Sequence, residues 1–200
     1  KPDRRQRQMC IRDRNYPQLI SKYTMGAVLY HQACDNYLDE KMTASNKPND
    51  KPYKKGAYYT GKEHSWDEAF GYWGAAAHTM TLSAQQSYDV AKKKDLKAAD
   101  FNKDGVVDLY KEMTYGHAYY ASAFDRGGKT DYLKTVTKAF IDGRKIITNA
   151  DGEKLSSSDL TKVQDLAQVI CSNWAQVIAE AVYKYACLLY TSDAADDQAC

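Results

Sequence analysis

Two short stretches of the 200-residue sequence carry side chains whose types and spacing could do chemistry. The first starts at Asp100 and places oxygen-bearing side chains on alternate residues, followed by a glycine and an aliphatic residue. Its candidate ligands are Asp100, Asn102, Asp104, the backbone carbonyl of Val106, Asp108 and Glu112. Calcium takes six to eight oxygen ligands, and EF-hand and dockerin loops supply them at this spacing. The stretch therefore predicts a calcium site with a structural role.

This candidate calcium loop departs from the pattern at its end. Position twelve normally holds an acid that binds the ion through both oxygens, but Lys111 occupies it here and Glu112 follows. Glu112 could supply its oxygens if the end of the loop is rearranged. The alternative is an Asp-rich solvated turn, in which Gly105 simply permits a positive φ angle.

The second stretch lies between Gly61 and Gly74 and contains a histidine among acids and aromatic residues. On a helix, His64 is about one turn from Asp67 and Glu68, so the three side chains can share adjacent faces. An imidazole with carboxylates at this spacing can bind a transition metal or relay a proton. These three residues are therefore candidate ligands for a second metal, iron or zinc.

Two other interpretations of the second stretch stay open. One is a metal-dependent hydrolase centred on His64, with Glu68 as the base. It would need a third ligand such as His78 or His117, because the second histidine of an HExxH motif is absent. The other is structural: the acids cap the helix and oppose its dipole, while His64 bonds a neighbouring backbone or carboxylate group. Helical spacing predicts a core role for the nearby aromatic residues Trp66, Phe70, Tyr72 and Trp73.

The elements that would position these residues are all predicted to be helical. Apolar residues recur near a period of 3.6 residues over 17–44, 63–79, 83–94, 109–125, 130–149 and 159–186. Ser83 and Gln86 predict a capping box at the third helix. No alternating run is long enough for a sheet, so the expected class is an all-α bundle.

The first of these helices is expected to bury one apolar face. That face contains Leu19, Ile20, Tyr23, Ala27, Tyr30, Cys34, Tyr37 and Leu38. Cys34 and Cys171 are far apart in the sequence and form neither a CxxC metal site nor a disulfide framework. We expect both to be buried free thiols.

Both ends of the sequence resemble a translated transposon sequencing adapter. Residues 4–14 match its forward strand, and residues 187–197 match the reverse complement in another frame. We therefore interpret 1–14 and 187–200 as adapter-derived segments with few core contacts, and 15–186 as a helical domain fragment.

The charge of the domain excludes some classes of partner. Residues 15–186 hold 22 basic and 21 acidic side chains, a net charge of +1. This balance does not steer the chain to nucleic acid or to an anionic membrane. No stretch approaches the roughly 18 consecutive apolar residues of a transmembrane helix.

A family resemblance rests on the stretch Tyr-Tyr-Thr-Gly-Lys-Glu-His-Ser-Trp-Asp-Glu-Ala-Phe-Gly-Tyr at 58–72. Supporting matches lie at 16–22, 35–41, 100–108 and 173–185. These segments resemble an uncharacterised bacterial family known only as a domain of unknown function. The resemblance covers essentially all of 15–186. It implies a secreted or lipid-anchored envelope protein, with an N-terminal part and its export signal missing here.

That family in turn resembles the imelysin-like helical proteins. These are periplasmic or surface-held, are associated with iron acquisition and share a Gly-x-His-x-x-Glu signature. The present chain departs from this signature, because Gly61 is three residues before His64 and Asp67 takes the place of the Glu.

The expected fold is thus an all-α, imelysin-like, truncated bundle with one EF-hand or dockerin-like calcium loop. The expected function is that of a non-enzymatic metal-binding protein of the periplasm or cell surface. It would assist iron acquisition beside other envelope proteins of an iron-uptake system, with Ca²⁺ as a structural ion. The alternatives are the hydrolase and a calcium-stapled interaction module.

Overall fold

The computed structural model describes residues 16–198, and the side chains of residues 20–185. This part of the chain contains helices and no strand, apart from one isolated bridge between Pro52 and Thr60. The expected all-α class is therefore confirmed. Within the same residues, no helix combines the length and the apolar character needed to span a bilayer. The predicted lack of core contacts for 1–14 and 187–200 falls on side chains outside the described residues.

The first helix is continuous but changes its winding. It consists of α2 (Tyr16–Thr24), η1 (Met25–Tyr30), η2 (Gln32–Glu40) and α3 (Lys41–Thr43). η1 and η2 are wound as π-helix, with hydrogen bonds from i to i+5. Apolar residues spaced at α-helical intervals therefore do not all lie on one face of this helix. Ile20 and Tyr23 are 65% and 76% exposed, against expectation, whereas Cys34, Tyr37 and Leu38 are buried as predicted.

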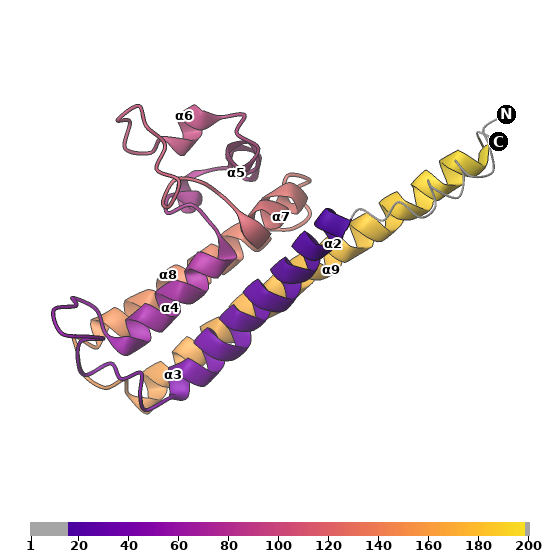
Figure 1. Cartoon of the computed structure of the whole chain (residues 1–200). Helices are drawn as coiled ribbons and strands as arrows, with labels where there is room; N and C mark the ends of the chain where they lie inside the picture. The colour runs from indigo at the N-terminus through magenta and orange to yellow at the C-terminus, as the bar shows by residue number, and fades with distance from the viewer. Residues whose placement is uncertain (1–15, 199–200) are drawn as a thin grey trace.

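The bundle contains the first helix, α4 (Gly61–Trp73), α8 (Tyr132–Asn149) and α9 (Ser157–Gln198). The first helix lies along α9, and α4 lies along α8 (Figure 1). Trp66, Trp73 and Trp174 are each at most 1% exposed in the core between these helices. The prediction that the aromatic residues of α4 form core is confirmed for Trp66 and Trp73.

A glycine sets how closely α4 and α8 approach. Trp66 donates its indole N–H to the carbonyl of Phe140 at 2.8 Å, which fixes the ring against α8. A Cβ atom at Gly143 would lie 2.1 Å from that ring. Because no side chain fits in this space, the packing of α4 on α8 depends on the absence of one at position 143.

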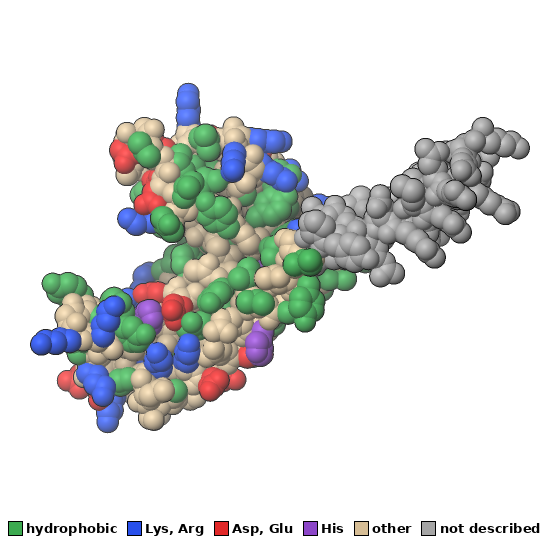
Figure 2. Space-filling view, viewed as in Figure 1, with side chains coloured by type: hydrophobic (Ala, Val, Ile, Leu, Met, Phe, Trp, Pro, Cys, Tyr) green, Lys and Arg blue, Asp and Glu red, His purple; other side chains and the backbone are tan. Residues whose placement is uncertain are grey.

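Residues 74–115 form a small lobe that stands off the bundle (Figures 1 and 2). It contains η3 (Thr79–Thr81), α5 (Ala84–Ala91) and α6 (Leu96–Ala99), and it leads into α7 (Gly116–Asp125). Its core of Leu82, Val90, Ala99 and Met113 is separate from the core of the bundle. Where the chain leaves and re-enters the bundle, Tyr115 N–H donates to the Gly74 carbonyl at 2.7 Å.

The two cysteines of the domain form a disulfide, so the expectation of free thiols was wrong. Cys34 on η2 and Cys171 on α9 are bonded, with their Cα atoms 5.8 Å apart and a sequence separation of 137. The pairing arises because the first helix lies along α9. Neither residue carries a local signal of this, since only the bundle brings the two helices together.

The predicted helix boundaries are confirmed in part. The capping box of Ser83 and Gln86 is present at α5, and Ser156 caps the start of α9 through the N–H of Asp159. The helix expected over 109–125 begins only at Gly116. The Lys111 carbonyl accepts a hydrogen bond from Ala77 N–H at 2.7 Å, so tertiary pairing replaces helical pairing there.

Candidate metal centres

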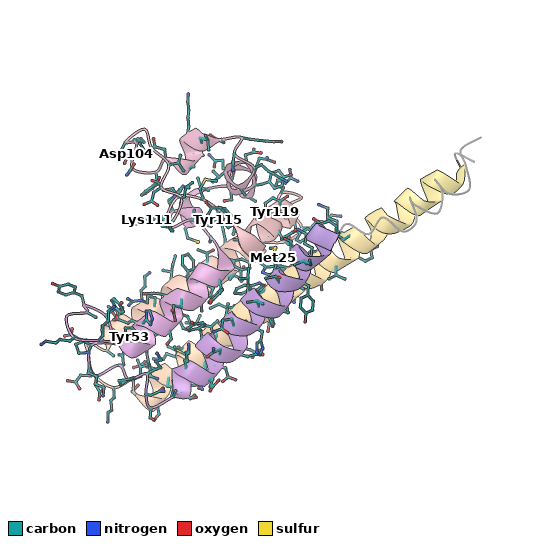
Figure 3. All side chains as sticks on the ribbon, viewed as in Figure 1. Met25, Tyr53, Asp104, Lys111, Tyr115 and Tyr119 are labelled. Atoms are coloured by element: carbon teal, nitrogen blue, oxygen red, sulfur yellow. A yellow bond between two sulfur atoms is a disulfide. The ribbon has the colours of Figure 1, made fainter. Side chains whose placement is uncertain are left out.

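The candidate calcium loop occupies the outer part of the lobe. It starts where α6 ends and returns to the lobe core at Met113. Figure 3 shows Asp104 in the lobe and Tyr53 at the opposite, loop-bearing end of the bundle. Lys111 and Tyr115 lie between the loop and the bundle. The site is thus carried by a small independent core rather than by the main bundle.

The loop is wound around its own acidic side chains. Asp100 accepts backbone hydrogen bonds from Asp104 at 3.2 Å and from Gly105 at 3.0 Å. Asn102 accepts from Asp104 N–H at 3.0 Å, and Asp104 accepts from Val106 N–H at 2.8 Å. Gly105 has a φ angle of 83°, which permits the sharp turn that these bonds require.

Glu112 connects the two ends of the loop. One carboxylate oxygen accepts N–H bonds from Phe101 at 3.0 Å and Asn102 at 3.4 Å, and the other accepts from Asp108 at 2.8 Å. Its side chain is buried. The acid that follows position twelve is therefore directed at the loop, and it holds the loop closed through backbone N–H groups.

Asp108 is the candidate ligand with competing partners. Tyr110 N–H donates to it at 2.8 Å, and the Lys111 ammonium lies 3.5 Å away. The Tyr110 hydrogen bond, followed by Lys111, holds the pKa of Asp108 below its usual range. An ion at this loop would have to share the carboxylate with both groups.

The donor set fits a hard cation because it consists of oxygen atoms alone. Each carboxylate oxygen has two acceptor sites, so an oxygen that accepts an N–H bond can still bind an ion. Among the described residues, no three His, Cys, Asp or Glu side chains are gathered as they would be around a metal. The loop acids would therefore have to converge further on binding, together with the Asn102 amide and the Val106 carbonyl.

The three residues of the second candidate site, His64, Asp67 and Glu68, do not all lie together. His64 Nε2 lies 3.4 Å from Glu68 Oε1, so the structure brings these two residues together. Asp67 instead accepts a hydrogen bond from Arg144 Nε of α8 at 2.8 Å. The side chains of His64 and Glu68 are 25% and 37% exposed, and Asp67 contributes to the contact between α4 and α8.

The acids at the start of α4 have the structural role that the sequence left open. Glu63 forms a capping box with Thr60, and it accepts hydrogen bonds from Arg144 at 2.6 Å and from Thr148 at 2.9 Å. Burial alone would raise the pKa of Glu63. The Thr60 N–H, the Thr148 hydroxyl and the Arg144 guanidinium together hold that pKa below its usual value.

Most of the remaining residues of the stretch also have partners that hold the fold. Lys62 donates to the Met42 carbonyl and Ser65 to the Gly61 carbonyl. A Cβ atom at Gly61 would lie 3.0 Å from the backbone of Lys47, so the loop before α4 packs closely on the helix. The pattern that suggested chemistry therefore secures the start of α4.

His64 lies against aromatic rings that sequence reasoning missed. The imidazole centroid is 4.0 Å from that of Tyr53 and 5.5 Å from that of Tyr59. These two rings stack on each other at 5.9 Å with an interplanar angle of 21°. The tyrosines come from the loop before α4, where the only sequence signal is a local excess of tyrosine.

The other two candidate histidines have separate surroundings. His78 bonds the Ala98 carbonyl at 2.9 Å within the lobe. His117 packs edge-on against Trp174 at 5.5 Å, and burial, then the charge of Lys22, lowers its pKa to about 4. The preceding Gly116 packs on the Trp73 carbonyl at the end of α4, about 14 Å along the helix from His64. The third ligand that a hydrolase would need is not assembled among the described residues.

Comparisons with known proteins identify one match. A family described as a domain of unknown function (DUF4856) matches residues 13–186. This range starts two residues before the stretch 15–186 that was interpreted above as the domain, and it ends at the same residue. No curated protein and no solved structure matches the chain.

Proposed function

We propose that this chain, which belongs to the DUF4856 family, is a non-enzymatic, calcium-stabilised helical protein of an oxidising compartment outside the cytoplasm. The observation that carries the proposal is the loop at 100–108, in which carboxylate and amide oxygens alternate around a tight turn. The periplasm or the cell surface is the corresponding location.

Calcium would act here by joining segments that few other contacts hold. The lobe core is small, and the loop bonds mainly to itself and to Glu112. An ion bound by Asp100, Asn102, Asp104, Asp108 and the Val106 carbonyl would tie the end of α6 to the turn that leads into α7. Glu112 already accepts three backbone N–H bonds, so we assign Glu112 a positioning role first.

The disulfide supports the location. Disulfides form and persist in oxidising environments and are rare in the cytosol of mesophiles. Cys34 and Cys171 are bonded within the bundle core. A protein exported to the periplasm or anchored at the surface would form this bond, and a cytosolic one would keep two thiols.

The proposal has a more specific part, which is an imelysin-like fold with a role in iron uptake. The pair His64 and Glu68 would supply two ligands, while Asp67 is bonded to Arg144. Zinc sites in proteins use at least three protein ligands. An iron or zinc site would therefore have to be completed by groups from another envelope protein.

Elemental analysis of the protein purified without chelator tests the proposal. We expect one calcium ion per chain, lost in Asp104→Ala and retained in the matched exposed variant Lys97→Ala. Absence of calcium after dialysis against excess Ca²⁺ would contradict the calcium part. Iron or zinc that is lost in His64→Ala would instead indicate a protein that binds a transition metal at His64.

The location is tested by mass spectrometry of peptides from cells treated with a thiol-blocking reagent before lysis. We expect the peptides of Cys34 and Cys171 to be joined and unlabelled. Full labelling of both thiols would contradict an oxidising compartment.

A further inference from the structure

The outer tip of the lobe, which we define as residues 96–110, leaves much apolar surface in water. It consists of α6, on the side of the lobe that faces away from the bundle (Figure 1), and the candidate calcium loop. Of the sixteen exposed large apolar side chains among the described residues, five belong to this short segment. Such a concentration marks a surface that meets another molecule. The exposed fractions are 50% for Leu96, 59% for Phe101, 68% for Val106, 62% for Leu109 and 99% for Tyr110.

The backbone of the outer tip is held in place, although these side chains are exposed. The lobe has a buried core of its own. Glu112 accepts hydrogen bonds from the N–H groups of Phe101 and Asp108 at 3.0 and 2.8 Å. The Phe101 ring stacks on His78 at 5.0 Å, and His78 bonds the Ala98 carbonyl at 2.9 Å. The apolar side chains are therefore presented from a fixed loop, which lowers the entropic cost of binding.

Exposed lysines without acidic partners lie in and beside the outer tip. Lys93, Lys94, Lys97 and Lys103 are exposed, and among the described residues none of them forms an ion pair. Lysine and hydrophobic side chains adjoin one another on the surface of the lobe (Figure 2). The balanced charge of the whole domain conceals this local group of cations.

The acids of the loop oppose these lysines unless an ion is bound. Residues 74–115 contain six basic and six acidic side chains, and the acids include Asp100, Asp104 and Asp108. A bound Ca²⁺ would add two positive charges and make the lobe cationic. Attraction to an anionic surface should therefore depend on calcium.

Lysines beside exposed apolar residues favour a lipid surface over a protein partner. Protein interfaces are depleted in lysine, and each partner usually contributes about 20–30 residues, which is more than the outer tip contains. At a membrane surface, apolar side chains enter the boundary between headgroups and acyl chains, and lysines attract anionic headgroups. The outer tip provides both kinds of side chain.

We propose that the outer tip of the lobe docks on an anionic phospholipid surface. Val106, Leu109 and Tyr110 would enter the lipid, and the exposed lysines would lie against the headgroups. This inference rests on the proposed function, because bound calcium has to offset the loop acids. The lobe would then hold the bundle at a membrane surface.

Sedimentation of the whole chain with lipid vesicles tests this proposal. The vesicles contain phosphatidylcholine alone, or phosphatidylcholine and phosphatidylglycerol in equal parts, each with Ca²⁺ or with EGTA. We expect binding only to the mixed vesicles and only with Ca²⁺. Val106→Ala with Leu109→Ala should weaken it about tenfold or more, because apolar burial in lipid is lost. Lys94→Ala with Lys97→Ala should weaken it by a similar factor, because two cations are removed from the anionic surface.

Matched double substitutions on the bundle serve as controls. Ile20→Ala with Val28→Ala removes side chains that are 65% and 49% exposed on the first helix. Lys54→Ala with Lys55→Ala removes two exposed lysines from the loop before α4. Both controls should bind the mixed vesicles as the parent chain does. If all four double variants bind as the parent chain does, calcium merely bridges the chain to any anionic surface, and the proposal is overturned.

The calcium content of each variant separates this inference from the proposed function. Bound calcium without vesicle binding would overturn the membrane inference alone, whereas a parent chain without calcium would overturn the calcium role as well. Binding in EGTA, or equal binding to phosphatidylcholine alone, would also contradict the membrane inference. If the Val106 and Leu109 variant loses calcium, the lysine variant decides the test. A dimer in light scattering that the Val106 and Leu109 variant dissociates would assign the outer tip to a second copy of the chain.

Discussion

The start of α4 and the loop at 100–108 each contain three acids, but they satisfy these acids in opposite ways. At α4, Glu63 and Asp67 are bonded across the bundle to Arg144. In the lobe, Asp100 and Asp104 accept hydrogen bonds from their own loop. An acid bonded across the bundle holds two helices together, whereas an acid bonded within a loop can still accept an ion.

Removing the disulfide should have the largest effect on stability. Because the bond joins two helices of the bundle, the effect should be confined to the bundle and spare the lobe. A crosslink over a sequence separation of 137 contributes about 5 kcal/mol in the chain-entropy model, and native disulfides contribute about 2–5 kcal/mol in practice. We expect Cys34→Ser with Cys171→Ser to lower the free energy of unfolding by that amount, measured by urea denaturation. Calcium affinity should be unchanged. A parallel loss of calcium binding would show that lobe and bundle are one unit.

Gly143→Ala tests the close packing of α4 on α8. The added methyl group would overlap the Trp66 ring, and overpacking a core costs about 1–3 kcal/mol. We expect a loss near 3 kcal/mol in chemical denaturation, because the ring is also hydrogen-bonded and cannot move freely. The matched control is Gly71→Ala on the exposed side of α4, where nothing lies within 4 Å and alanine should stabilise the helix slightly. Equal effects of the two substitutions would contradict the packing described here.

Acid should weaken the bundle through His117. Burial lowers its pKa from 6.5 to about 4 in the folded chain, so the unfolded chain binds the extra proton between these values. Stability from this residue is therefore complete above about pH 6.5 and is lost as the pH falls towards 4. The loss is about 3 kcal/mol, at 1.36 kcal/mol per pKa unit.

Urea denaturation at pH 7.5 and pH 4.5 measures this effect. His117→Phe should reduce the pH dependence relative to the parent chain. If the pH dependence persists in His117→Phe, other groups are responsible.

Calcium binding should have the smallest effect on stability, and this effect should be confined to the lobe. An ion at ten times its Kd stabilises the folded chain by about 1.4 kcal/mol. We expect hydrogen exchange to slow in residues 96–113 and not in α8 or α9. Asp104→Ala should abolish the change. Protection that extends through the bundle would remove the distinction between the two regions.

Much of the fold could be predicted from the sequence, because helical periodicity and helix caps depend on residues a few positions apart. The apolar spacing of 130–149 and the Ser83 cap of α5 need no distant partner to be recognised. Ile20 and Tyr23 were misplaced because π-winding changes the phase of a helix face without a clear sequence signal. The 109–115 segment was misplaced because Ala77, more than 30 residues earlier, takes its hydrogen bond.

The candidate sites divide in the same way. The calcium loop could be proposed because its ligand spacing lies within thirteen consecutive residues. The role of Asp67 could not, because Arg144 lies 77 residues away. Tyr53 and Tyr59 could not be linked to His64, since only the folded loop stacks their rings on the imidazole.

By itself, the sequence determined that this protein is helical and which loop carries alternating oxygen donors. Both properties depend on residues a few positions apart, where spacing alone fixes geometry. Only the tertiary structure decided that Cys34 and Cys171 are bonded and that Asp67 pairs with Arg144 rather than with His64. Those contacts depend on how the helices and their connecting loops pack, because packing alone brings together side chains that are distant along the chain.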